Sequence, residues 1–294
     1  MPHSTEDKET KFFKLTDGRR ISYLEYGDSK GKPVILLHGI HHSRLMFGLI
    51  PGFPFSDKAR FIVPDRPGYG MSDTYKHGFA VIDYYKDIRE LADYLALDKF
   101  SIFAFSGAAA YSLVCAWRMP DRVLNVGIYA GVGPLNEVSN RGIIPPLKLL
   151  YWVSDIMPTV ASGIMDSVGI LIRKNFSLYN KLLRSRLTET EQVLHSKLSP
   201  PEGIVSDRLE GFRQGGRAST YDISLARNWP VPLEEISTEV HIWQGSDDRY
   251  TGSMGEYMAE LIPNSHLNIV DGEGHYWIID NLKEMLESLV EVSL

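Results

Sequence analysis

The chain has 294 residues, a length typical of one or two folded domains. Hydrophobic residues make up 44% of the chain and charged residues 23%, which argues against a disordered or fibrous protein. The net charge of −6 gives no support for binding to nucleic acid. The single cysteine, Cys115, excludes an internal disulfide and cannot by itself supply a metal site.

No segment of the sequence has the character of a secretion signal or a membrane span. The first ten residues are polar and lack the apolar run that precedes a signal cleavage site. A membrane-spanning helix needs about 20 apolar residues. The two longest candidates, residues 100–117 and 143–172, are interrupted by Ser106-Gly107 and by charges and prolines, respectively. We therefore predict a soluble, cytoplasmic protein without integral membrane association.

Strand and helix patterns alternate along most of the chain. Residues 12–16 and 21–26 alternate with a period of two around Asp17-Gly18, which predicts a hairpin. Residues 34–37 form a short continuous apolar run, typical of a strand buried on both faces of a parallel sheet. Similar runs occupy residues 61–63, 101–105, 126–130, 240–243 and 267–270, and helical patterns occupy residues 82–95, 107–117 and 281–292. These patterns predict an α/β fold with helices on both faces of a mostly parallel sheet and an antiparallel edge.

One long segment departs from this alternation. Residues 133–236 contain helical patterns and many prolines but no strand-like run. We interpret them as a helical cap inserted into a core domain made of residues 1–132 and 237–294; a separate helical domain is the alternative. The apolar side chains of the cap, Trp152 and Met157 among them, could cover the core, roof an apolar substrate pocket, or form an interfacial surface for lipid.

A candidate nucleophile lies between a buried strand and a helix. The literal G-x-S-x-G match at Gly27-Asp28-Ser29-Lys30-Gly31 lies in a polar connection, where its glycines are turn residues. Ser106, in contrast, stands between residues 101–105 and the helix that follows, with the small residues Ala104 and Ala108 two positions on either side. This context indicates a nucleophile elbow. A serine that only caps the helix is the alternative.

The groups that a serine nucleophile requires follow other predicted strands. A base, an acid that orients the base, and donors for an oxyanion should lie at the carboxyl ends of parallel strands. Asp247 and Asp248 follow residues 240–243, and His275 follows residues 267–270. His38-Gly39-Ile40 follows residues 34–37 and offers backbone N–H groups. The order serine, acid, histidine is the order expected for α/β-hydrolases.

With these motifs, and with residues 65–73 after the next strand, the sequence resembles the α/β-hydrolase fold superfamily, of the esterase-like type with a serine nucleophile and a helical cap. The resemblance covers about residues 12–132 and 237–292 and implies an eight-stranded sheet. It implies Ser106 as nucleophile, His275 as base and Asp248 as orienting acid, with Asp247 as the alternative acid. It also implies that the N–H groups of Ile40 and Gly107 form the oxyanion hole.

The function that this resemblance implies is hydrolysis of a small, largely apolar ester, or less readily an amide, with no metal or organic cofactor. A carbon–carbon bond hydrolase, a cofactor-free haloperoxidase and an acyltransferase would use the same three residues, and a ligand-binding receptor could keep the same fold. We expect a monomer or homodimer that binds a small molecule and no nucleic acid. The predicted substrate-binding residues are His42, Phe105, Trp152 and Met157; a solvent-facing position is the alternative for His42.

Overall fold

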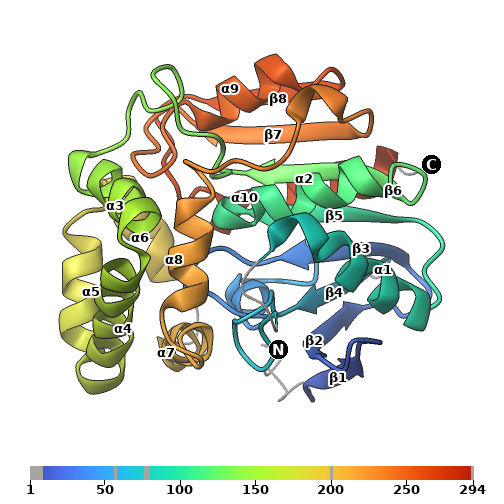
Figure 1. The fold of residues 1–294 in the computed structure, drawn as a ribbon, viewed down its shortest axis with the longest axis horizontal. Helices are drawn as coiled ribbons and strands as arrows, with labels where there is room; N and C mark the ends of the chain where they lie inside the picture. The colour runs from blue at the N-terminus through green and yellow to red at the C-terminus, as the bar shows by residue number, and fades with distance from the viewer. Residues whose placement is uncertain (1–8, 56–57, 76–79, 199–200, 293–294) are drawn as a thin grey trace.

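The computed structural model describes residues 9–55, 58–75, 80–198 and 201–292. In these residues a single sheet of eight strands has the order β1-β2-β4-β3-β5-β6-β7-β8 (Figure 1). The antiparallel edge consists of β1 (Lys11–Lys14) and β2 (Arg20–Gly27), as the hairpin pattern predicted. The other strands are parallel: β3 (Lys32–Leu37), β4 (Ala59–Pro64), β5 (Phe100–Phe105), β6 (Val123–Tyr129), β7 (Glu239–Gly245) and β8 (Ser265–Val270).

The alternation of side chains in each central strand builds two separate cores. In β3, Ile35 and Leu37 pack with α1 (Tyr84–Tyr94), α2 (Ala109–Arg118) and α9 (Met254–Leu261). Val34 and Leu36 point to the other face, where they join the core that α10 (Ile278–Val292) and the short helix η1 (Met46–Leu49) cover. Both faces of the central strands are therefore buried, as their continuous apolar runs predicted.

The last strand is a correction to the sequence prediction. We predicted residues 267–270 as a strand buried on both faces, but β8 is an edge strand in which Leu267 is 39% and Ile269 is 42% exposed. The error arises because an apolar run indicates a strand without indicating whether another strand lies beside it. The helix α9 was not predicted at all.

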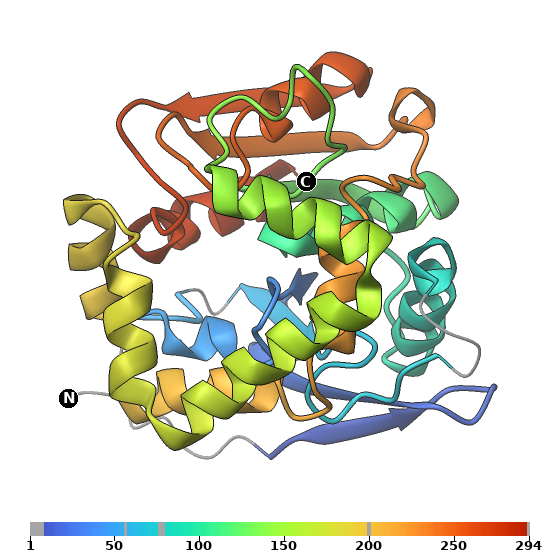
Figure 2. The ribbon, with the colours of Figure 1, turned by 60° about the vertical axis from the view of Figure 1, so that its left-hand side comes forward.

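The segment between β6 and β7 is helical, as predicted. It contains α3 (Pro145–Ile156), α4 (Pro158–Lys174), α5 (Phe176–Arg184), α6 (Glu189–Lys197), α7 (Pro201–Gly211) and α8 (Arg217–Ser224). Short helices occur outside it at η2 (Val81–Asp83) and η3 (Ser106–Ala108), and at its end at η4 (Leu233–Glu235). Figures 1 and 2 place α3, α4 and α5 beside the sheet rather than on either of its faces. We keep residues 133–236 as our proposal for the bounds of the cap.

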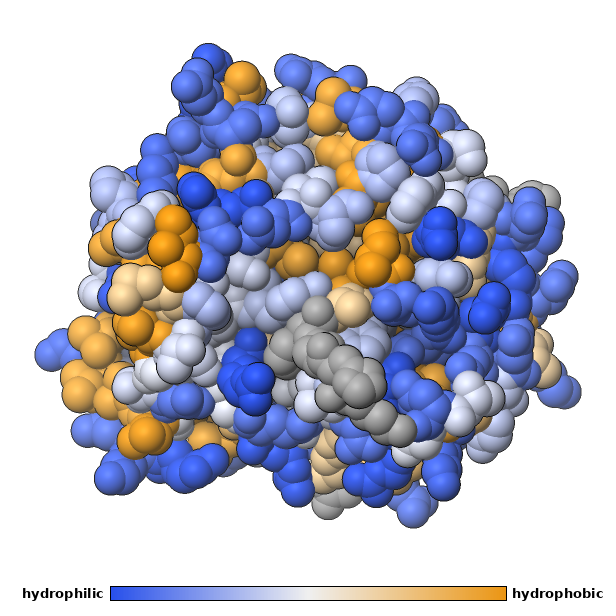
Figure 3. Space-filling view, viewed as in Figure 1, coloured by the Kyte–Doolittle hydropathy of each residue, from blue (hydrophilic) through white to orange (hydrophobic). Residues whose placement is uncertain are grey.

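The cap has its own small core and an apolar outer surface. Residues such as Met165, Phe212 and Ile223 pack together inside it. In Figure 3, orange side chains gather at the left of the view, over the region of the cap helices. None of the helices in the described part of the chain combines the length and apolar character that crossing a bilayer requires.

Candidate active site

Ser106 is held in a strained turn at the carboxyl end of β5. Its backbone has φ +55°, a left-handed conformation that non-glycine residues rarely adopt. The carbonyl oxygen of Ser106 accepts a 3.0 Å hydrogen bond from the N–H of Val132, which supports the turn. This is the strand-to-helix turn that the sequence context predicted. The literal match at Ser29 lies in the exposed connection between β2 and β3.

His275 and Asp248 meet Ser106 at the same edge of the sheet. His275 Nε2 lies 3.1 Å from Ser106 Oγ, and His275 Nδ1 lies 2.8 Å from Asp248 Oδ2. A carboxylate can only accept, so Nδ1 carries the proton and Nε2 presents its lone pair to the serine hydroxyl. Asp248 is buried, whereas the alternative acid Asp247 is exposed, so the structure brings Asp248 and not its neighbour to the histidine.

The surroundings of Asp248 keep it ionised. Burial raises the pKa of this carboxyl, but the electrostatic interaction with His275 and the hydrogen bonds lower it by more, so the pKa lies below its ordinary value. The hydroxyl of Thr251 donates to Oδ2 at 2.7 Å, and the N–H of Tyr250 donates to Oδ1 at 2.8 Å. Gln244 adds a 3.2 Å hydrogen bond from Nε2 to Oδ2. Asp248 can therefore hold the imidazole in one tautomer.

The predicted oxyanion-hole residues approach each other closely. A Cβ added to Gly107 would lie 2.3 Å from Cγ1 of Ile40, so only glycine fits at this position. The N–H groups of Ile40 and Gly107 have no acceptor among the turn and loop hydrogen bonds of the described chain. Both are available to an incoming oxygen atom.

A cavity of about 160 Å³ opens at Ser106 and has mainly apolar walls. His42 and Phe105, two of the predicted substrate-binding residues, line it. Trp152 and Met157 do not, since their side chains are 43% and 44% exposed and lie outside the lining. Helical periodicity explains the difference within α3, because Leu147, Leu150 and Tyr151 occupy the face turned to the cavity.

The cap contributes polar residues to the site that the sequence analysis missed. Glu191 of α6 is buried, and its Oε1 accepts a 2.8 Å hydrogen bond from the backbone N–H of His275. Its Oε2 accepts from the N–H of Thr188 at 2.9 Å, forming the capping box of α6. The spacing Thr188-x-x-Glu191 could have revealed the capping box of α6, but no local pattern reveals the contact between Glu191 and His275, 84 positions further along the chain.

A second histidine–aspartate pair lies at the wall of the cavity. His42 Nδ1 is 2.6 Å from Asp207 Oδ2, and Asp207 Oδ1 accepts from the N–H and the hydroxyl of Ser43 at 2.9 and 2.8 Å. Burial is the main cause that lowers the pKa of His42, to about 4, so this imidazole is neutral at neutral pH. The structure thus places His42 at the cavity and against α7 rather than in solvent.

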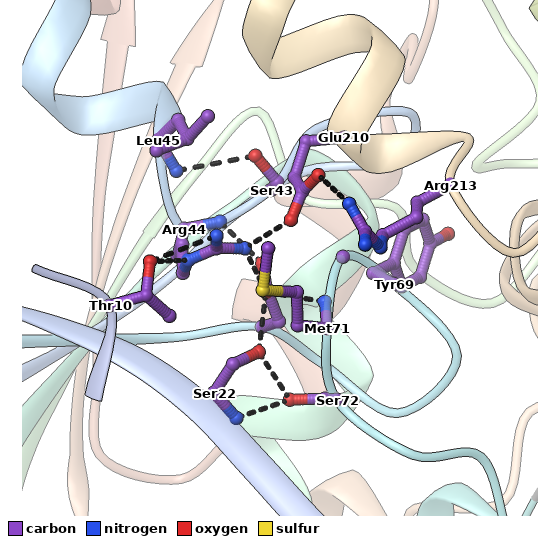
Figure 4. A network of polar contacts seen from close by, with 12 residues as sticks. Thr10, Ser22, Ser43, Arg44, Leu45, Tyr69, Met71, Ser72, Glu210 and Arg213 are labelled. Carbon is purple, nitrogen blue, oxygen red and sulfur yellow. Dashed lines mark hydrogen bonds and ion pairs between the residues drawn. The ribbon is translucent and has the colours of Figure 1, made fainter. Parts of the chain in front are cut away.

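The helix that carries Asp207 is tied to the core by an arginine (Figure 4). Arg44 Nη1 donates to Asp65 Oδ2 and to Glu210 Oε1, both at 2.6 Å. Asp65 in turn accepts from the hydroxyl of Ser22 at 2.7 Å, and the N–H of Ser22 donates to the hydroxyl of Ser72 at 2.9 Å. Asp65 and Ser72 therefore support a turn behind the site, and this turn also anchors α7.

The three histidines of the loop after β3 do not form a metal cluster. His38 is fully buried, where its Nε2 accepts from the N–H of Arg66 at 3.1 Å. In the part of the chain that the structure describes, no group of three or more histidine, cysteine, aspartate or glutamate residues is arranged to hold a metal ion. Cys115 is buried in the core.

The sheet topology and the strand-end residues define a class of protein, the α/β hydrolases. A family model described as the alpha/beta hydrolase family matches residues 34–287, and the chain belongs to this family. It is 30% identical over 144 residues to an uncharacterized hydrolase of Saccharomyces cerevisiae, a match that covers 48% of each protein. The chain therefore aligns with about half of the length of this relative.

Two further comparisons extend over nearly the whole chain. A proline iminopeptidase of Neisseria gonorrhoeae is 23% identical over 95% of this chain and 94% of its own length. The structure of a carboxylesterase from Nitrososphaera gargenis superposes with a TM-score of 0.69 at 17% identity, covering 97% of this chain and 100% of the other. At this identity the structural likeness shows the fold and not the substrate.

Proposed function

We propose that this protein is a serine hydrolase that cleaves a small carboxylic ester through an acyl-enzyme on Ser106. The observation that carries the proposal is the continuous chain of hydrogen bonds from Ser106 through His275 to Asp248. Such a chain makes an otherwise unreactive hydroxyl nucleophilic. The apolar walls of the cavity favour a largely apolar substrate.

In the first half of the reaction, Nε2 of His275 removes the proton of Ser106 as its Oγ attacks the ester carbonyl carbon. The N–H groups of Ile40 and Gly107 stabilise the negative charge on the carbonyl oxygen. His275 then donates the proton to the departing alkoxide, and the carbon–oxygen bond breaks to leave an acyl ester on Ser106. In the second half, His275 deprotonates a water molecule that attacks this ester, and the acid is released with Ser106 restored.

Labelling with a fluorophosphonate probe tests the nucleophile. We expect the wild-type protein to be labelled, Ser106→Ala to lose both labelling and p-nitrophenyl esterase activity, and Ser29→Ala to keep both. Ser29 is the matched control because it lies in the other G-x-S-x-G sequence and is exposed. The loss of kcat should reach about a thousandfold or more. Equal labelling of Ser106→Ala and wild type would refute the assignment.

A substrate panel separates the ester from other chemistry of the same three residues. Peptide hydrolysis, as in the neisserial relative, would bring an amino group into a cavity that already contains the guanidinium of Arg208. Two positive charges in a buried site repel, so the cavity favours an ester over a peptide with a free amino terminus. Turnover of prolyl peptides above that of p-nitrophenyl esters would contradict this proposal. Exclusive turnover of carbon–carbon bonds would contradict it as well.

A further inference from the structure

Arg208 of α7 is a buried cation in the wall of the cavity that contains Ser106. The residue is 5% exposed and lines both that cavity and a smaller one beside it. His42, Phe105 and Tyr276 also line both cavities. Its Nη1 lies 3.4 Å from the carbonyl oxygen of His41, a long contact, and its side chain also contacts that of Tyr276. Within the described segments, Arg208 forms no ion pair with a carboxylate.

The carboxylate next to Arg208 in the sequence already has hydrogen-bond donors of its own. Asp207 precedes Arg208 in α7, but Oδ2 of Asp207 is bonded to His42 and Oδ1 to Ser43. The other two acids at the site, Asp248 and Glu191, hold the side chain and the backbone N–H of His275, respectively. Each acid thus has donors of its own, and among the described residues the guanidinium lacks a partner that accepts two parallel hydrogen bonds.

An unpaired charge inside a protein is unfavourable unless a partner of opposite charge joins it. Burial lowers the pKa of Arg208, but Tyr179, Tyr276 and Asp207 raise it by more, so the guanidinium stays charged. Burial also lowers the pKa of His41 to about 3 and that of His42 to about 4, so these two histidines of the cavity wall do not add to this charge. Arg208 is the one arginine or lysine that lines the cavity, as far as the described residues show.

We propose that Arg208 binds a carboxylate group of the substrate and selects esters that carry one. The planar guanidinium presents a fork of N–H donors that matches a carboxylate in two parallel hydrogen bonds. The remaining cavity wall, with residues such as Leu147 and Leu150, suits the apolar part of such a molecule. This inference rests on the proposed esterase function, and it narrows the substrate class to half-esters of dicarboxylic acids or esters of hydroxy or phenolic acids.

Two matched substrate pairs test the inference on either side of the scissile bond. The first pair is the p-nitrophenyl half-ester of adipic acid and its isostere in which an isopropyl group replaces the carboxylate. The second pair is p-carboxyphenyl acetate and p-isopropylphenyl acetate. For each pair, the ratio of kcat/KM for the anionic to the neutral ester is measured in wild type, Arg208→Met and Arg208→Lys, which cancels the intrinsic reactivity of each ester.

In at least one pair, we expect Arg208→Met to lower this ratio about tenfold or more, the loss expected for hydrogen bonds to a charged partner. Arg208→Lys should restore part of the ratio, since it keeps the charge without the fork. Arg173→Met is the matched control, because Arg173 is an exposed arginine of another cap helix. Ratios unchanged by Arg208→Met in both pairs would overturn the inference.

A measurement on the unmodified protein guards against a variant that fails to fold. Hexanoate should inhibit neutral-ester hydrolysis at a concentration about tenfold or more below that required of hexanamide. Equal inhibition by the two would contradict the role of Arg208. Neutral-ester hydrolysis that persists in Ser106→Ala would instead contradict the proposed function, so the two failures can be told apart.

Discussion

Glu191 provides a test of whether the cap positions His275, the proposed catalytic base. The carboxylate makes three hydrogen bonds, with the N–H of His275 at 2.8 Å and with the N–H and hydroxyl of Thr188 at 2.9 and 3.2 Å. Truncation in Glu191→Ala removes all three and leaves the buried N–H of His275 without an acceptor. A lost acceptor of this kind costs about 1–3 kcal/mol, so we expect destabilisation of about 3 kcal/mol when the loss of the capping box of α6 is included.

Thr188→Ala separates the two roles of the carboxylate. This variant weakens the capping box and should destabilise the protein by about 1 kcal/mol, but the hydrogen bond to His275 remains. We expect kcat of Thr188→Ala to equal that of the wild type. In Glu191→Ala we expect kcat to fall about ten- to hundredfold with little change in KM, because a displaced imidazole loses its alignment with Ser106.

The assay is steady-state hydrolysis of a neutral p-nitrophenyl ester, together with urea unfolding of each variant. Glu191→Gln keeps one acceptor oxygen and should recover part of the lost kcat. Glu189→Gln changes an exposed residue of the same helix and should leave both kcat and stability at the wild-type values. A Glu191→Ala protein that is less stable yet retains full kcat would refute the positioning role and leave Glu191 as a helix cap only.

Two further predictions concern the oxyanion hole and the buried histidines. Gly107→Ala should lower kcat about a hundredfold because its Cβ would lie 2.3 Å from Ile40, whereas Gly163→Ala, where no atom lies within 4 Å, should keep kcat and add about 0.5–1 kcal/mol of stability. Equal kcat values for the two variants would contradict the predicted oxyanion hole. Burial lowers the pKa of His42 and His195 to about 4 from the ordinary value of 6.5, so the unfolded chain binds more protons between these limits. The free energy of unfolding, measured in urea, should therefore fall as the pH is lowered from about 6.5 to 4, on the order of a few kcal/mol for each histidine. His195→Gln should flatten this slope; a slope equal to that of the wild type would show that burial of His195 is not the cause.

The core of the fold and the strand-end residues were predictable because their signals are local. Continuous apolar runs marked β3 to β7, and small residues around Ser106 at a strand–helix junction marked the elbow. The rule that parallel strands end at one edge then predicted that Ser106, His275 and one of the two acids Asp247 and Asp248 lie close together, and the resemblance to the α/β-hydrolases favoured Asp248. The same reasoning failed for β8, since the neighbours of a strand are not encoded in its own apolar run.

The polar cap residues at the site were not predictable, for a physical reason that also bears on specificity. Arg208, Asp207 and Glu191 lie in helices whose sequences only indicate exposed polar faces, and their burial depends on contacts with loops far along the chain. For Arg208, the important contacts are those of its neighbour: Asp207 is hydrogen-bonded to His42 and Ser43. As a result, no carboxylate of the described residues forms an ion pair with the guanidinium of Arg208. In our proposal, the core strands therefore specify the reaction, and the charged residues of the cap, whose partners only the folded chain reveals, select which ester enters.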